Sequence, residues 1–199
     1  MATVEDHHPH ESTEADAMSR LTTPAPDEVP AQVQATLDGI RAQFGFVPTM
    51  FATLAANPAV LDIVMTLQGK IGRVLDAKTR HTIALAVSQA NGCDYCQAMH
   101  AYVSSELGGM SHDDIELAHA GSSTDPRRAA VARFAQRVVE SRGQVSDADI
   151  AAVRGAGYTD AQIQAIVTVA VVFLLTNFLN NVNQTDVDIP AVAEANTAA

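Results

Sequence analysis

Apolar residues recur at three- and four-residue intervals along most of the chain between about residues 30 and 181. This spacing places apolar side chains on one face of an α-helix. In the segment 58–74, the recurring residues are Val60, Ile63, Val64, Leu67 and Ile71. No segment shows the convincing two-residue alternation of a strand, so the pattern predicts an all-α protein.

Residues that commonly begin helices divide this pattern into eight or so segments joined by short loops. Pro30, Asn57 with Pro58, and Asp76 each suit the start of a helix, and Ser146 with Asp149 and Thr159 with Gln162 have the spacing of a capping box. The predicted helices cover 30–43, 49–56, 58–74, 77–90, a segment from Cys93 to about 107, a segment that begins near 111, 126–141, a segment that begins at 146, and 159–181.

The chain of 199 residues is long enough for one domain that buries about 70% of its unfolded surface. Residues 1–20 are polar and small and predict a disordered tail, whereas 21–190 predict a single helical domain. The alanine-rich residues 191–199 are expected to fray.

Composition agrees with a helical protein and narrows the choice of partners. Aromatic residues make up only 5% of the chain and alanine is abundant, which favours helices over strands. The formal net charge is −11. An acidic surface repels phosphate backbones and anionic lipids, so we expect neither a nucleic acid nor a membrane partner.

The longest apolar run is Val167–Leu175, which is interrupted by Thr168 and is shorter than the roughly 20 residues that span a bilayer. It predicts a buried core or interface helix. Residues 1–20 lack the apolar stretch of a secretory signal, so the expected location is cytoplasmic. The apolar stripe on the predicted helix over 160–180 is wider than packing against a single neighbour requires, and it predicts a homo-oligomer. Its residues are Val167, Val171, Leu174, Leu175 and Phe178.

The two cysteines of the chain, Cys93 and Cys96, lie three residues apart, and His100 follows four residues later. On a helix, Cα atoms three residues apart are about 5 Å from each other, within the range of about 4.4–6.8 Å that a disulfide accepts. All three side chains then share one helix face, and His100 leans back toward Cys96.

A histidine beside a thiol favours its reactive thiolate form. A thiol with a pKa of about 8.5 is only about 3% ionised at pH 7, whereas a pKa near 6.5 gives roughly 75%. Asn91 and Gly92 are expected to break the preceding helix and place Cys93 at a new helix N-terminus, which also stabilises a thiolate. The histidine favours Cys96 and the helix start favours Cys93, so spacing alone does not identify the nucleophile.

Other readings of the pair are two plain core cysteines or part of a metal site. A structural zinc site needs four ligands and this stretch supplies at most three, although His112 and His119 could add to them. We therefore expect no native metal, and the tail residues His7, His8 and His10 suit only nonspecific metal binding. No nucleotide or flavin motif is present, so no cofactor is expected.

The stretch 79–108, which contains IALAVSQANGCDYCQAMHAYVSSELG, resembles the AhpD-like alkylhydroperoxidase family of the carboxymuconolactone decarboxylase superfamily. The segments 44–61, 147–163 and 176–190 are also similar to longer members, so the resemblance covers about residues 40–190. It implies an AhpD-like helical bundle that assembles as a trimer or hexamer. It also implies activity as a thiol peroxidase and disulfide reductase that uses a peroxide substrate and a thiol reductant of unknown identity.

By this resemblance, Cys96 attacks the peroxide, Cys93 resolves the product as a disulfide, and His100 relays protons. Two positions depart from the family pattern. His81 occupies the place of a relay glutamate and cannot supply a carboxylate, although a histidine can carry a proton. Tyr95 stands where a histidine is found in the best-studied type of member, and we expect it to pack against neighbouring helices.

Two further functions remain open from the sequence. One is the decarboxylase or lactone-type activity of superfamily relatives, which generally lack the cysteine pair. The other is a non-catalytic redox sensor or metal-binding module.

Overall fold

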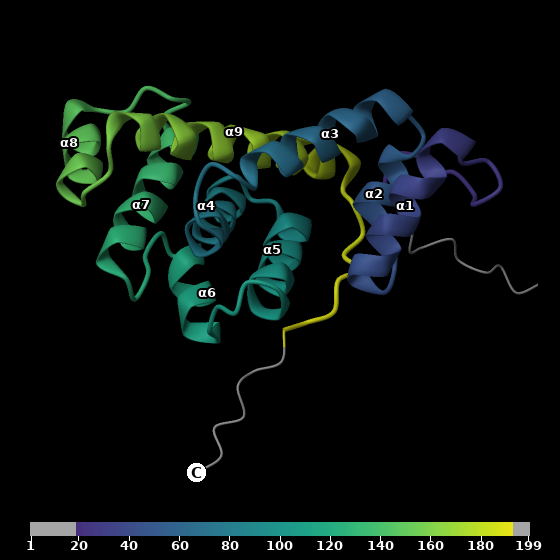
Figure 1. Cartoon of the computed structure of the whole chain (residues 1–199), viewed down its shortest axis with the longest axis horizontal. Helices are drawn as coiled ribbons and strands as arrows, with labels where there is room; N and C mark the ends of the chain where they lie inside the picture. Colours follow the sequence, from purple (N-terminus) through teal and green to yellow (C-terminus); the bar gives the residue numbers. More distant parts are fainter. Residues whose placement is uncertain (1–18, 193–199) are drawn as a thin grey trace, which may run out of the picture.

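A computed structural model describes residues 19–192, and this part of the chain contains α-helices and no strand, which confirms the all-α prediction (Figure 1). The helices are α1 (Ala31–Phe44), α2 (Thr49–Leu54), α3 (Pro58–Ile71), α4 (Ala77–Ala90), α5 (Asp94–Glu106), α6 (His112–His119), α7 (Pro126–Glu140), α8 (Asp147–Gly155) and α9 (Asp160–Asn183). Of the two predicted tails, residues 1–18 and 193–199 lie outside the described residues.

The predicted helix starts are largely confirmed, because the side chains that cap them are in place. Asp76 accepts a hydrogen bond from the backbone N–H of Thr79 at the start of α4. Both predicted capping boxes form, at Ser146 and at Thr159. Helix α3 ends at Ile71, three residues before the predicted end at 74. Gly72 is a poor helix former, and the chain must turn before the cap at Asp76.

Helix α4 forms the centre of the fold. It contacts α5, α6, α7 and α9, and its residues Ile83 to Val87 have no exposed surface. Two of these five residues are alanines, which let neighbouring helices approach closely. Helix α4, which precedes the cysteine pair, is thus packed on several sides. The turn that leads from its C-terminal end to Cys93 therefore starts from a fixed position.

Helix α9 runs along one side of α4, α5 and α7 (Figure 1). Its 24 residues make it the one helix of the described part that is long and apolar enough, by length and composition, to cross a membrane. Ile166, Val169 and Ala170 on its inner face are fully buried in the core, as expected for a core helix of a folded domain. The C-terminal half of the same face carries buried asparagines, among them Asn177 and Asn180.

Candidate active site

The turn between α4 and α5 positions the cysteine pair. Gly92 adopts a left-handed backbone conformation with φ of 59°, which ends α4 and lets the chain reverse. Cys93 is then the N-cap of α5, and its sulfur accepts a hydrogen bond of 3.3 Å from the backbone N–H of Cys96. The predicted break before Cys93 is therefore present.

Cys93 and Cys96 form a disulfide in this structure, and their Cα atoms are 5.2 Å apart, close to the spacing expected from the sequence. Both cysteines are buried, but their surroundings differ. Cys96 lines a cavity, whereas Cys93 is not among the lining residues and has no exposed surface. A small molecule that enters the cavity therefore meets the sulfur of Cys96.

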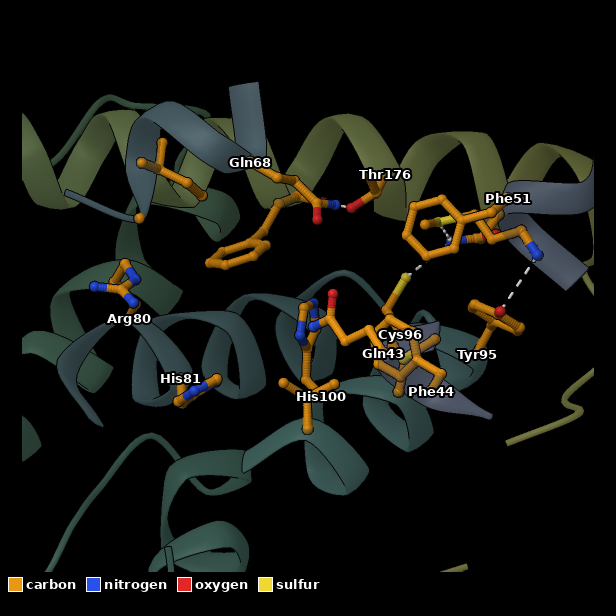
Figure 2. A pocket seen from close by; sticks show the side chains of 17 residues that line it. Gln43, Phe44, Phe51, Gln68, Arg80, His81, Tyr95, Cys96, His100 and Thr176 are labelled. Atoms are coloured by element: carbon orange, nitrogen blue, oxygen red, sulfur yellow. Dashed lines mark hydrogen bonds between the residues drawn. The ribbon is translucent and has the colours of Figure 1, made fainter. Parts of the chain in front are cut away.

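This cavity has a volume of about 210 Å³ and opens between α1, α2, α3, α4, α5 and α9. Figure 2 shows the cysteine sulfur, two histidines and an arginine in its wall. Aromatic and other apolar side chains supply most of the remaining surface: Phe44, Met50, Phe51, Ile71, Met99, Val103 and Phe173. The cavity thus combines a disulfide sulfur with a largely apolar lining, and a largely apolar lining with a few polar groups is typical of binding sites for small organic molecules.

His100 lines the cavity from α5, one helical turn beyond Cys96. Its ring meets that of Phe173 edge to face, with ring centroids 4.8 Å apart. Burial, together with the nearby His81 and His119, lowers the pKa of His100 to about 3. The imidazole is therefore neutral at pH 7 and carries one unprotonated ring nitrogen.

His81 lines the same cavity from α4 and is half-buried. Burial lowers its pKa, and the charge of Arg80 adds to the effect. Its ring also rests against Gly108, where an added Cβ would lie 2.8 Å from the imidazole Cδ2. In the view of Figure 2, His100 lies between His81 and Cys96. The structure thus brings together all four residues predicted for the site.

Tyr95 packs into the core between α5 and α2, as expected, and only 3% of its surface is exposed. Its hydroxyl oxygen accepts a hydrogen bond of 3.2 Å from the backbone N–H of Met50. Burial raises the pKa of the phenol, so it stays protonated. Tyr95 thus forms part of the cavity wall, and its hydrogen bond to Met50 links α5 to α2.

Asn180 of α9 is a site residue that the sequence analysis did not identify. Its side-chain amide donates to the sulfur of Cys96 at 3.4 Å and to that of Met50 at 3.2 Å. Only 3% of Asn180 is exposed. A signal was present in the sequence, since asparagines at 177, 180 and 183 repeat every three residues along an otherwise apolar helix. Polar side chains on a buried face require hydrogen-bond partners there.

A chain of hydrogen bonds fixes the orientation of the Asn180 amide. Its carbonyl oxygen accepts from the hydroxyl of Thr185 at 2.9 Å, and that hydroxyl oxygen accepts from the amide of Asn183 at 3.0 Å. The carbonyl oxygen of Asn183 accepts from the backbone N–H of Leu21 at 2.7 Å. Every donor points toward the sulfur, and such aligned bonds strengthen one another.

The described residues contain no group of three or more histidine, cysteine or acidic side chains that could hold a metal ion. His112 and His119, considered above as extra ligands, lie at opposite ends of α6. His7, His8 and His10 lie outside the described residues.

Lowering the pH is expected to destabilise the fold, because burial lowers the pKa of His81, His100 and His119. Below about pH 6.5, the unfolded chain binds more protons at these residues than the folded protein does. The free energy of unfolding should therefore decrease as the pH falls from about 7 to 5, by about 1.4 kcal/mol per pH unit for each histidine that stays neutral.

Urea unfolding at several pH values measures this slope. The variant His100→Asn should show a shallower dependence than the wild type, since its largest contributor is gone. Equal slopes in the two proteins over this range would contradict the assignment.

Comparison with known proteins supports the predicted family. Residues 58–137, from α3 into α7, match the carboxymuconolactone decarboxylase family. A comparison with curated proteins finds no significant match. The structure of an alkylhydroperoxidase AhpD core, an uncharacterized peroxidase-related protein from Ralstonia eutropha JMP134, superimposes with a TM-score of 0.77 at 25% identity, covering 87% of this chain and 94% of that chain.

Two other solved structures share the fold. An uncharacterized peroxidase-related protein from Silicibacter sp. TM1040 has a TM-score of 0.76 at 22% identity, covering 88% of this chain and 94% of that chain. The debrominase Bmp8 in complex with 2,3,4-tribromopyrrole has a TM-score of 0.73 at 16% identity, covering 85% of this chain and 92% of that chain. The predicted AhpD-like resemblance and helical fold are thus confirmed.

Proposed function

We propose that this protein, whose residues 58–137 match the carboxymuconolactone decarboxylase family, is a dithiol peroxidase and disulfide oxidoreductase centred on Cys93 and Cys96. One observation carries the proposal: Cys96 lies in the wall of a largely apolar cavity, and Cys93, which is bonded to it, is fully buried outside that wall. A substrate in the cavity contacts the sulfur of Cys96, and the sulfur of Cys93 is close enough to form a disulfide with it. This arrangement suits a reaction with separate attacking and resolving cysteines.

In the reduced enzyme, the thiolate of Cys96 attacks the terminal oxygen of a hydroperoxide. The O–O bond breaks, Cys96 becomes a sulfenic acid, and the alkoxide leaves as an alcohol after it takes up a proton. The thiol of Cys93 then loses its proton and attacks the sulfur of Cys96, the disulfide forms, and the displaced hydroxide takes up that proton and leaves as water. A dithiol reductant restores the two thiols by thiol–disulfide exchange.

His100 has the place and protonation state for proton transfer in this cycle. As a neutral imidazole it accepts the proton of Cys96, and the thiolate so formed stabilises the resulting imidazolium. The same proton is then available for the departing alkoxide. His81, in the same cavity, is the next residue of the proposed relay and takes the place of a carboxylate.

Multiple turnover tests this proposal against a redox sensor. The protein is mixed with excess dithiothreitol and cumene hydroperoxide, and alcohol formation is followed by chromatography. We expect the protein to raise the rate of alcohol formation at least about tenfold above that of dithiothreitol and peroxide alone, whereas a sensor with slowly reacting thiols would leave that rate unchanged. No increase over the protein-free reaction would overturn the enzymatic proposal.

A decarboxylase or lactone-type activity predicts a different dependence on the cysteines. In that case the double variant Cys93→Ser/Cys96→Ser would keep full turnover of a lactone or carboxylate substrate. The cavity favours thiol chemistry, because one of the two cysteines is in its wall and a neutral histidine is one helical turn away.

We also propose that the outer face of α9 joins copies of this chain into a homo-oligomer. Val171, Phe178 and Val182 on this face are 54%, 55% and 64% exposed, although they are apolar. Light scattering is expected to give a mass well above the 21.0 kDa of one chain. The variant Val171→Glu/Phe178→Glu should be monomeric, since charges oppose burial of this face. A single-chain mass for the wild type would refute the assembly.

A further inference from the structure

Arg80 places a positive charge in the wall of the cavity that Cys96 lines. It is half-buried, and its guanidinium donates to the backbone carbonyl of Leu75. Within residues 19–192, no carboxylate forms an ion pair with it. Its remaining N–H groups are therefore available to a ligand, and a guanidinium binds a carboxylate with two parallel hydrogen bonds.

The surroundings of Arg80 are basic in an otherwise acidic protein. Residues 70–80 contain four of the twelve lysines and arginines of the chain and a single carboxylate, Asp76, so four positive charges against one negative give a formal charge of +3. The whole chain carries −11. Ile71 and Gly72 from this stretch also line the cavity. A local positive field at its edge raises the concentration of anions there.

The size and lining of the cavity limit the rest of the ligand. Its volume of about 210 Å³ is below the roughly 300–1,000 Å³ of pockets for drug-sized ligands. Phe44, Phe51 and Phe173 give it flat apolar walls. In Figure 2, Arg80 lies on the far side of His81 and His100 from Cys96, so the charge and the sulfur are at different places along one cavity.

We propose that the substrate is a small aryl or alkyl hydroperoxide that carries a carboxylate, and that Arg80 binds this carboxylate. This inference rests on the proposed peroxidase function and assigns its substrate class. The carboxylate pairs with the guanidinium, the apolar body fills the space between the phenylalanines, and the hydroperoxide faces Cys96. Binding at a distance from the reacting atoms holds the peroxide in place for attack.

A matched pair of substrates tests the carboxylate directly. Cumene hydroperoxide with a para carboxylate and the methyl ester of the same compound differ only in the charged group. The rate of Cys96 oxidation by each is measured in stopped flow with reduced wild-type protein. We expect the acid to react at least about tenfold faster than the ester, as one charge-assisted contact supplies that factor.

Variants of Arg80 test whether this residue causes the preference for the acid over the ester. In Arg80→Met the ratio of the acid rate to the ester rate should fall to about one, and in Arg80→Lys part of the preference should remain because the charge is kept. Arg73→Met removes an exposed charge from the same basic stretch and should keep most of the preference. The ratio is internal to each protein, so differences in overall stability do not affect it.

The outcomes separate this inference from the proposed function. If wild-type protein oxidises Cys96 equally fast with acid and ester, the Arg80 subsite is refuted and the peroxidase proposal stands. If neither compound nor hydrogen peroxide oxidises Cys96, the peroxidase proposal itself fails. A preference that survives Arg80→Met would place the anion site elsewhere.

Discussion

Replacing Cys96 by serine is expected to abolish peroxide-driven turnover, with a loss on the order of a thousandfold or more. A serine hydroxyl is not ionised near neutral pH, whereas a cysteine thiol readily forms the nucleophilic thiolate. Cys96 is the cysteine in the cavity wall, so no second thiol there can take over the attack. Cys93 has no exposed surface through which a peroxide would reach it.

Replacing Cys93 by serine should give a different result. The first oxidation of Cys96 is expected to proceed at a rate near that of the wild type, but the sulfenic acid then persists because the resolving thiol is missing. Trapping with dimedone followed by mass spectrometry should label Cys96 in Cys93→Ser and leave Cys96→Ser unlabelled. Dimedone labelling of Cys93 in the Cys96→Ser variant would reverse the proposed roles.

Serine is the matched substitution at position 93 for a structural reason. The sulfur of Cys93 accepts the backbone N–H of Cys96 at the start of α5, and serine is a preferred residue at such an N-cap. Cys93→Ser thus removes the thiol and keeps the cap, whereas Cys93→Ala would also remove the cap, at a cost of about 1 kcal/mol. Thermal melting of the wild type, Cys93→Ser and Cys96→Ser checks that these three proteins are equally stable.

Local chemistry explains why so much of the fold was predictable. The start and end of α4 follow from the cap at Asp76 and from the Asn91–Gly92 turn, and both act within a few residues of the chain. The distance between the Cys93 and Cys96 Cα atoms follows from helix geometry alone. For the same reason, the relation of His100 to Cys96 on α5 was accessible from their spacing.

Features that depend on packing were not predictable in this way. Ile63 has the spacing of a core residue, but it is 52% exposed, while Leu61 beside it is buried, because neighbouring helices cover only one of the two apolar faces of α3. The protonation state of His100 depends on burial beside Phe173 and on two other histidines. The cavity itself is assembled from six helices.

The contact of Asn180 with Cys96 joins residues 84 positions apart and leads to the second large expected effect. The variant Asn180→Leu keeps the approximate volume and removes the donor. We expect the Cys96 thiolate to lose one hydrogen bond to a charged group, which is worth about 1.5–3 kcal/mol. The oxidation of Cys96 by peroxide should slow by about ten- to a hundredfold, and the pKa of its thiol should rise by about one to two units.

The direction of this shift is fixed by the charge states. The Asn180 amide stabilises the thiolate over the thiol, so its removal favours the protonated form and moves ionisation to higher pH. The rate of alkylation of Cys96 by iodoacetamide, measured as a function of pH in a Cys93→Ser background, reports the midpoint. Thr185→Val should cause a smaller shift in the same direction, because it leaves the amide in place and removes only the bond that orients it.

The neighbouring residue on α9 provides the control for this experiment. The side-chain amide of Asn181 donates to the backbone carbonyl of Asn91 at 3.1 Å, whereas the hydrogen bond to the Cys96 sulfur comes from Asn180. Asn181→Leu therefore removes a hydrogen bond from the same helix and should leave the alkylation midpoint unchanged. If Asn180→Leu folds and its midpoint equals that of Asn181→Leu, then the bond to Cys96 does not control the reactivity of the thiol. If the alkylation midpoint shifts only in Asn180→Leu and Thr185→Val, then the hydrogen bonds from Thr185 to Asn180 and from Asn180 to Cys96 control the reactivity of the thiol.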